Sequence, residues 1–135
     1  MVVNIVIPVF NRLEETKGII HNIRRQITKN KLRIFVVDDG SSDGTAEWIK
    51  QQSDINIFKG TGFLYWGGAI DLAIKNILNE CANDDWLLLL NNDDNDPVVV
   101  DDGIVFLFFF ILLRDGIFLL LNNNNQIQNI TQEMH

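Results

Sequence analysis

The chain has 135 residues, of which 47% are hydrophobic and 10% aromatic, and its formal net charge is −7. This length fits one domain with a single core, and the apolar content excludes intrinsic disorder as the main state. The acidic balance argues against nucleic-acid binding, which needs clustered Lys and Arg. It leaves a nucleotide ligand open, because a cation can bridge protein carboxylates and phosphate.

The chain begins with a predicted strand followed by a predicted helix. Residues 2–9 form a β-branched apolar run closed by Pro8, and they lack the basic start and long apolar core of a signal peptide. Asn11 is expected to cap the following helix, with Glu14 as its capping-box partner. Apolar residues recur at helical spacing at Ile19, Ile23 and Ile27.

The next part of the chain continues the alternation of strands and helices. We expect strands at 34–37, 55–58 and 86–90, a short helix capped by Asp43 and running through 49, a glycine-rich loop at 60–68 and a helix at 69–78. The strands are continuously apolar rather than alternating, which is typical of a parallel sheet covered on both sides. The sequence therefore predicts an α/β fold, with a mostly parallel sheet and helices on both faces.

Composition changes after Pro97. Two apolar blocks at 104–113 and 117–121 are followed by four consecutive asparagines at 122–125. The blocks are too short and too interrupted to predict a membrane span. We interpret 98–135 as an anomalous or truncated C-terminal segment of the same domain as 1–97.

Polar clusters follow three of the predicted strands, at 8–11, 38–41 and 91–94. In open α/β sheets the ligand crevice lies just outside the carboxyl ends of the strands. Each cluster alone is also compatible with a turn or a helix cap, since Asn, Asp, Gly and Ser dominate turns. Three such clusters at one edge of a sheet favour a ligand site.

The residue types in these clusters suggest what the ligand is. We hypothesise that Asp39 accepts a hydrogen bond from a ring N–H of a pyrimidine base. The acids and amides at 91–94 supply the oxygen ligands that Mg²⁺ or Mn²⁺ prefers beside a diphosphate. Phe63, Tyr65 and Trp66 in the glycine-rich loop either line a donor pocket or pack on the sheet.

The first 95 residues closely resemble family-2 glycosyltransferases of the GT-A fold, which are inverting enzymes that use nucleotide-diphospho-sugars. The resemblance depends on Val-Ile-Pro-Val-Phe-Asn at 6–11, Val-Val-Asp-Asp-Gly-Ser-Ser-Asp-Gly-Thr at 36–45 and Leu-Leu-Asn-Asn-Asp at 89–93. The stretch Gly-Phe-Leu-Tyr-Trp-Gly-Gly at 62–68 looks like the rhamnosyltransferase-like branch, which builds bacterial surface polysaccharides.

The resemblance also implies site residues. The nucleotide-sugar-binding set is Pro8, Val9, Phe10, Asn11, Asp39, Gly68, Asn91 and Asn92. Asp93 matches the metal-binding Asp of the family's DXD-type motif, with Asn91 in place of the first Asp, and the implied cofactor is Mg²⁺ or Mn²⁺. Nothing after residue 97 matches the family's general base, so Asp101, Asp102 and Asp115 are left without that role.

The implied activity is metal-assisted, inverting transfer of a sugar from a UDP- or dTDP-sugar to a glycan or lipid-linked acceptor. The implied location is the cytoplasm, with peripheral association at the inner face of the membrane; Cys81, the only cysteine, fits a reducing compartment. The alternative is a catalytically incomplete nucleotide-sugar-binding or scaffold domain. A phosphoacceptor signalling domain is a weaker alternative, because it needs acids after the first strand, where this chain has Pro8 and Asn11.

Overall fold

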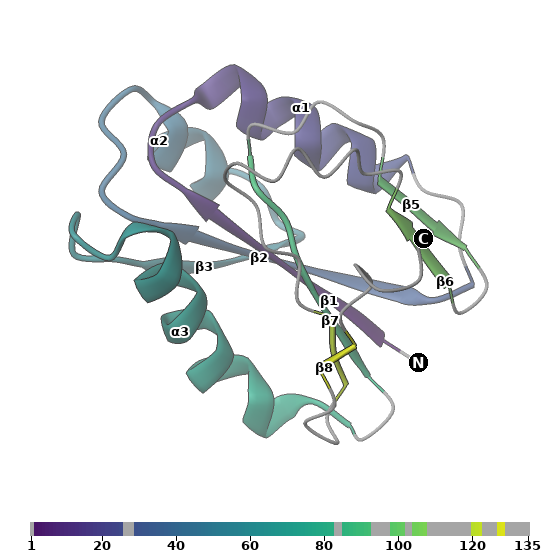
Figure 1. The fold of residues 1–135 in the computed structure, drawn as a ribbon. Helices are drawn as coiled ribbons and strands as arrows, with labels where there is room; N and C mark the ends of the chain where they lie inside the picture. Colours follow the sequence, from purple (N-terminus) through teal and green to yellow (C-terminus); the bar gives the residue numbers. More distant parts are fainter. Residues whose placement is uncertain are drawn as a thin grey trace, which may run out of the picture.

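The computed structural model describes residues 2–25, 29–82, 85–92, 98–101, 104–107, 120–122 and 127–128 (Figure 1). The first half contains, in chain order, β1 (Val2–Val9), α1 (Leu13–Arg24), β2 (Lys31–Asp38), α2 (Thr45–Lys50), β3 (Ile55–Lys59), α3 (Tyr65–Ile77), the 3₁₀ turn η1 (Leu78–Glu80) and β4 (Trp86–Leu89). Four short strands follow: β5 (Val98–Asp101), β6 (Ile104–Leu107), β7 (Leu120–Asn122) and β8 (Ile127–Gln128). The predicted order of strands and helices is confirmed.

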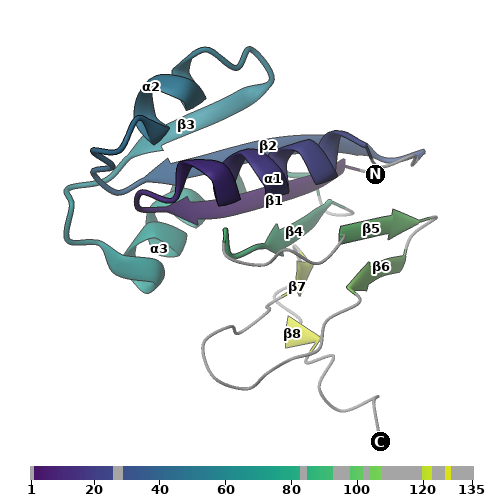
Figure 2. The ribbon, with the colours of Figure 1, turned by 90° about the horizontal axis from the view of Figure 1, so that it is seen from above.

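The main sheet of the described residues has the strand order β3-β2-β1-β4-β7-β8 (Figures 1 and 2). Strands β1 to β4 are parallel, whereas β7 pairs antiparallel with β4, and β8 antiparallel with β7. Strands β5 and β6 form a separate antiparallel pair. The carboxyl ends of the four parallel strands therefore lie along one edge of the sheet. The domain division at residue 97 stays a prediction.

Helices cover both faces of the parallel strands, as the sequence predicted. On one face α1 and α2 bury apolar side chains against the odd-numbered residues of β1. On the other face α3 packs against Val6 of β1 and against Phe35 and Val37 of β2. Because β1 is buried on both sides, its apolar run is continuous rather than alternating.

Pro8 lies inside β1 and does not end it. The carbonyl of Val6 accepts from Leu90 N–H on the β4 side (2.9 Å), and the carbonyl of Val9 accepts from Asp39 N–H on the β2 side (2.9 Å). The nitrogen of Pro8 therefore faces the β4 side, just beyond the last β1–β4 bond. Because no hydrogen bond between β1 and β4 needs an N–H at this position, proline removes none of them.

Two local expectations are wrong. The glycine-rich loop predicted at 60–68 ends early, because α3 begins at Tyr65 and includes Gly67 and Gly68. The predicted helix cap is also wrong: α1 is preceded by Arg12 in a left-handed conformation (φ 63°), and Asn11 directs its side chain elsewhere. Ile27, which we expected in the stripe of this helix, lies outside the described residues.

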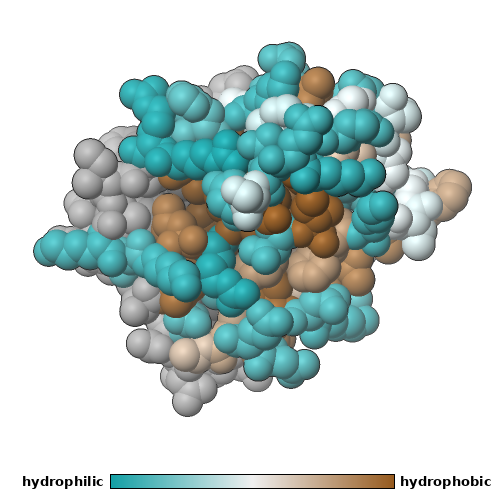
Figure 3. Space-filling view, turned by 180° about the vertical axis from the view of Figure 1, so that it is seen from behind, coloured by the Kyte–Doolittle hydropathy of each residue, from teal (hydrophilic) through white to brown (hydrophobic). Residues whose placement is uncertain are grey.

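The side of the molecule opposite to the view of Figure 1 is mostly hydrophilic, with apolar groups gathered in one central band (Figure 3). The edge strand β3 lies on this side (Figure 2), where Ile57 and Phe58 are only half-buried. Among the described residues no helix is both long enough and apolar enough to cross a membrane.

Candidate functional site

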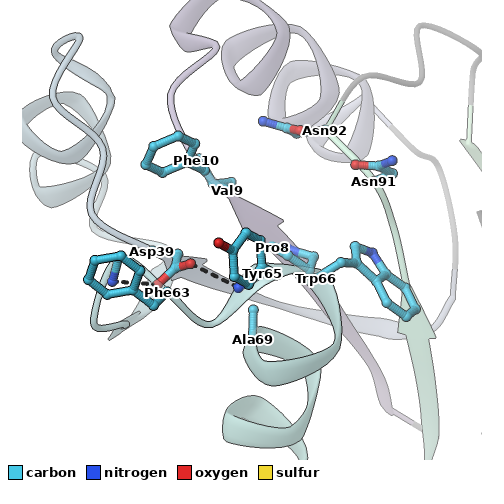
Figure 4. A pocket seen from close by; sticks show the side chains of 11 residues that line it. Pro8, Val9, Phe10, Asp39, Phe63, Tyr65, Trp66, Ala69, Asn91 and Asn92 are labelled. Atoms are coloured by element: carbon cyan, nitrogen blue, oxygen red, sulfur yellow. Dashed lines mark hydrogen bonds between the residues drawn. The ribbon is translucent and has the colours of Figure 1, made fainter. Parts of the chain in front are cut away.

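A pocket of about 410 Å³ lies at the carboxyl edge of the parallel strands (Figure 4). It is lined by Pro8, Val9, Phe10, Asp39, Gly62, Phe63, Tyr65, Trp66, Ala69, Asn91 and Asn92. These residues come from the ends of β1, β2 and β4 and from the segment around the start of α3. The three predicted polar clusters thus meet at one edge.

The pocket gathers six of the nine predicted site residues: Pro8, Val9, Phe10, Asp39, Asn91 and Asn92. Asn11 and Gly68 do not line it. Asp93, the predicted metal ligand, lies outside the described residues. Within the described part of the chain no group of three His, Cys, Asp or Glu side chains is arranged to hold a metal ion.

Asp39 is buried, and its carboxylate is hydrogen-bonded to the backbone of the segment that precedes and opens α3. Oδ1 accepts from Gly62 N–H (2.8 Å), and Oδ2 accepts from Leu64 N–H (2.9 Å) and Tyr65 N–H (3.1 Å). Leu64 is the N-cap of α3 and Tyr65 its first residue, and at a helix start N–H groups lack helical partners and the helix dipole favours an anion. Asp39 therefore caps a helix from a different loop, a role that the sequence analysis did not predict.

Glycines let this segment approach Asp39 closely. A Cβ at Gly60 would overlap with Oδ1 of Asp39 and would lie 2.7 Å from Cδ1 of Leu64. Gly40 has φ +86°, and a Cβ there would lie 3.1 Å from Cα of Gly62. We call Asp39 and residues 60–66 the aromatic flank of the pocket, because this segment carries Phe63, Tyr65 and Trp66.

The loop that follows the pocket residue Phe10 is held by polar groups. Asn11 donates its N–H to Oγ of Ser41 (2.8 Å), and its Oδ1 accepts from Ser42 N–H (2.8 Å). Asp38 supports the same turn, since its Oδ1 accepts from Ser41 N–H (3.0 Å). We call residues 10–13 together with 41–45 the polar flank. Asn11 acts here as a link between two loops.

Asp43 links the polar flank to the first residues of two helices, α1 and α2. Its Oδ2 accepts from Leu13 N–H in the first turn of α1 (3.1 Å), and its Oδ1 accepts from Thr45 N–H (3.0 Å) and from the Thr45 hydroxyl (2.5 Å). The hydrogen bond from the Thr45 hydroxyl is the main cause that lowers the pKa of Asp43 below its ordinary value. The N-cap of α2 is Gly44, one residue after the predicted Asp43, but the Asp43 carboxylate accepts from the first N–H of α2 and from the first N–H of α1.

Two amides form the β4 end of the pocket. Asn92 is buried, and its Nδ2 donates to Oγ1 of Thr16 on α1 (3.3 Å). The Thr16 hydroxyl in turn donates to the carbonyl of Arg12 (2.8 Å). This chain of bonds directs the amide nitrogen of Asn92 towards α1, so its amide oxygen is the atom suited to bind a ligand.

Phe63, Tyr65 and Trp66 all line the pocket. The sequence left pocket lining and packing on the sheet open and favoured packing for at least one of the three. Trp66 does both, because it also packs against the core under α3. Gly68 instead packs inside α3, where a Cβ would lie 3.2 Å from Cβ of Leu64.

The pocket has two chemically different ends. In Figure 4, Phe10 and Phe63 stand at one end near Asp39, whereas Asn91 and Asn92 stand at the other. Asp39 is the one charged residue among the eleven that line the pocket, and none of the eleven is a cation. A flat heterocycle suits the first end. A diphosphate at the second end would need a bound cation to offset its charge.

The family model described as glycosyl transferase family 2 matches residues 4–102. No curated protein sequence matches the chain significantly.

Solved structures are similar in fold. The mannosyltransferase PcManGT from Pyrobaculum calidifontis, in complex with GDP-Man and Mn²⁺, has TM-score 0.53 and 22% identity over 67% of this chain and 27% of its own. TarS of S. aureus has TM-score 0.56 and 17% identity over 69% of this chain and 17% of its own. A second TarS structure, residues 1–349, has TM-score 0.51 and 20% identity over 70% of this chain and 28% of its own.

At these identities the likeness shows the fold alone, and it confirms the predicted α/β fold of GT-A type. The chain covers less than a third of each of these proteins.

Proposed function

The chain belongs to glycosyl transferase family 2, and from this premise we propose that it binds a nucleotide-diphospho-sugar and transfers the sugar to an acceptor hydroxyl group. The observation that carries the proposal is that Asp39, from the end of β2, lines the same pocket as Asn91 and Asn92, from the end of β4. Ligands of open α/β sheets bind at this edge.

The two ends of the pocket suggest how the donor lies. The base occupies the end formed by Phe10 and Asp39, where an exposed ring offers a stacking surface and a carboxylate can accept an N–H. The diphosphate lies towards Asn91 and Asn92. This orientation places the anomeric carbon of the sugar beyond the β4 end, where the acceptor hydroxyl attacks and the anomer inverts.

The pocket supplies some of the ligands that a divalent cation needs. Amide oxygens such as those of Asn91 and Asn92 are acceptable ligands for Mg²⁺ or Mn²⁺, and Asp93 would add the charged ligand. When bound, the cation stabilises the departing nucleoside diphosphate as a Lewis acid. Support comes from the lining residues, which include no cation of their own to offset the diphosphate, and from PcManGT, which is in complex with GDP-Man and Mn²⁺.

The finer parts of the proposal come from the sequence. The stretch at 62–68 favours the rhamnosyltransferase-like branch, a glycan or lipid-linked acceptor and a role in surface polysaccharide synthesis. We place the protein in the cytoplasm, associated with the inner face of the membrane. A carboxylate general base would deprotonate the acceptor hydroxyl, and we assign it to no residue of the described chain.

The test is ligand-induced stabilisation of the chain. Saturating UDP or dTDP with Mn²⁺ should raise the melting temperature by about 5 to 10 °C, because ligand at 100 times its Kd adds about 2.7 kcal/mol. Asp93→Ala should remove the Mn²⁺-dependent part of the shift. Leu78→Ala changes an exposed residue outside the pocket and is the control. It should leave the ligand-induced shift in melting temperature unchanged. The proposal fails if no nucleoside diphosphate raises the melting temperature, with or without Mn²⁺.

Transfer activity separates the two candidate functions. We assign the general base to no described residue, and this motivates the alternative of a nucleotide-sugar-binding domain that does not complete the reaction. Binding without transfer to any glycan or lipid-linked acceptor would support that alternative. Turnover by the 135-residue chain would exclude it.

A further inference from the structure

Thr16 of α1 is a fully buried polar residue that lies beside the β4 end of the pocket without lining it. Its hydroxyl group makes two hydrogen bonds. It donates to the carbonyl of Arg12 (2.8 Å) and accepts from Nδ2 of Asn92 (3.3 Å). The N–H of Thr16 donates to the same carbonyl of Arg12 (2.9 Å), so the first turn of α1 holds the hydroxyl in place.

The direction of these bonds follows from the number of hydrogens available. A hydroxyl group has one hydrogen, and a carbonyl oxygen has none. The short contact between the Thr16 hydroxyl and the Arg12 carbonyl therefore uses the hydroxyl hydrogen. Towards Asn92 the hydroxyl offers only lone pairs, so it meets the NH₂ group of the amide and not the amide oxygen.

This arrangement decides which atom Asn92 presents to a ligand. Asn92 lines the pocket although it is only 6% exposed (Figure 4), and no residue in the described part of the chain donates to its Oδ1. With Nδ2 held against α1, the oxygen is the amide atom that is left for a ligand. An amide oxygen attracts a cation and repels phosphate oxygens, whereas an NH₂ group does the reverse.

We propose, on the basis of the function proposed above, that Thr16 is a positioning residue that makes diphosphate binding at the β4 end depend on a cation. It does so by holding Asn92 with its amide oxygen towards the pocket. Without the hydroxyl group the amide is free to turn over and to present NH₂ directly to the phosphate oxygens. Thr16 therefore sets the cation dependence of donor binding without contacting the donor or the cation.

The orientation of Asn92 is tested without any ligand, by NMR measurement of solvent exchange at its side-chain NH₂ group. Exchange should be slow in wild type and in Thr16→Ser, which keeps the hydroxyl group. It should be faster in Thr16→Val, which replaces the hydroxyl group by a methyl group. Equal exchange in Thr16→Val and wild type would show that the hydroxyl does not hold the amide, and this result overturns the proposal.

The effect on binding is tested by titration calorimetry of UDP, once with Mn²⁺ and once with EDTA in its place. Thr16→Val should lower the ratio of the two affinities about 10- to 100-fold, the usual effect of losing the group that orients a metal ligand. Thr16→Ser should keep the ratio of wild type. With EDTA, Thr16→Val should bind UDP at least as tightly as wild type, because an NH₂ group donates to phosphate. Equal weakening with Mn²⁺ and with EDTA would indicate a purely structural role and overturns the proposal.

Thr45→Val is the matched control for the loss of a buried threonine hydroxyl. Thr45 is as fully buried as Thr16 and begins α2, but its hydroxyl donates to Oδ1 of Asp43, which does not line the pocket. Both valine variants should lower the melting temperature, because each loses a buried hydrogen bond. Only Thr16→Val should change the ratio of UDP affinities.

The same experiments separate this proposal from the proposed function. An equal change of the ratio in Thr45→Val would show that the ratio follows stability, and it overturns the role of Thr16 alone. An unchanged ratio in Thr16→Val, in a chain that binds UDP, does the same. If neither UDP nor dTDP binds wild type, with Mn²⁺ or with EDTA, the proposed function and this inference fall together.

Discussion

The two flanks of the pocket are built on different principles. The polar flank is held by several groups that connect two loops: the side chains of Asn11, Ser41 and Asp43, and the backbone N–H of Ser42. The aromatic flank depends on one buried carboxylate, Asp39, and on glycines that allow the close approach. Removing one side chain of the polar flank leaves the bonds of the others in place, whereas removing the Asp39 carboxylate removes all three bonds that it accepts from residues 62–65. The aromatic flank should therefore be far more sensitive to single substitutions.

Asp39→Asn should have the largest effect. The amide keeps one oxygen, so at least one of the N–H groups of Gly62, Leu64 and Tyr65 faces an NH₂ group and loses its acceptor. The expected loss of unfolding free energy is about 3 kcal/mol, because a buried bond to a charged group is removed and a donor is left unsatisfied. Urea unfolding measures the loss. Hydrogen exchange should show faster exchange at these three amides, and unchanged protection there would contradict the single-anchor view.

Gly60→Ala tests the same contact by changing the glycine that packs against Asp39 instead of Asp39 itself. The added methyl group overlaps with Oδ1 of Asp39 and presses on the side chain of Leu64, so we expect about 1 to 3 kcal/mol of destabilisation. Gly67→Ala is the matched control, because nothing lies within 4 Å of its Cβ position and it sits inside α3. That variant should be neutral or up to about 1 kcal/mol more stable. Equal changes in stability for the two substitutions would show that packing against Asp39 does not contribute to the stability of the fold.

Asn11→Ala, in the polar flank, should lower the free energy of unfolding less than the two substitutions in the aromatic flank. It removes the bond from Ser42 N–H and places alanine at φ 59°, for an expected loss of about 1 to 2 kcal/mol. Asn11→Gly separates these causes, since glycine accepts this backbone and loses only the bond. Amides of the aromatic flank should exchange as in wild type in both variants. Faster exchange at Leu64 or Tyr65 would show that the flanks are coupled.

The contrast between the flanks also explains what the sequence could predict. The bounds of β1 agree with the apolar run at 2–9, because burial on both faces leaves an uninterrupted signal. Parallel pairing alone was enough to predict that the carboxyl ends of the strands lie together at one edge of the sheet. The partners of Asp39 and Asn11 could not be predicted, since they lie on loops brought close only by the folded sheet. No local pattern tells a ring that lines a pocket, such as Phe63, from one that packs in a core.

The smallest expected effect is a pH dependence confined to the polar flank. Hydrogen bonds, first from the Thr45 hydroxyl and then from backbone N–H groups, lower the pKa of the exposed Asp43. A carboxyl group whose pKa is lower in the folded state stabilises that state above its unfolded pKa of about 3.9, and the contribution is lost as pH falls through the folded pKa. Asp43→Asn keeps the shape and removes the charge. Its melting temperature should lie slightly below that of wild type at pH 7, and the difference should be smaller at pH values below about 3.9. A difference that stays constant between these pH values would show that the charge of Asp43 contributes nothing, and that neutral hydrogen bonds alone hold the polar flank.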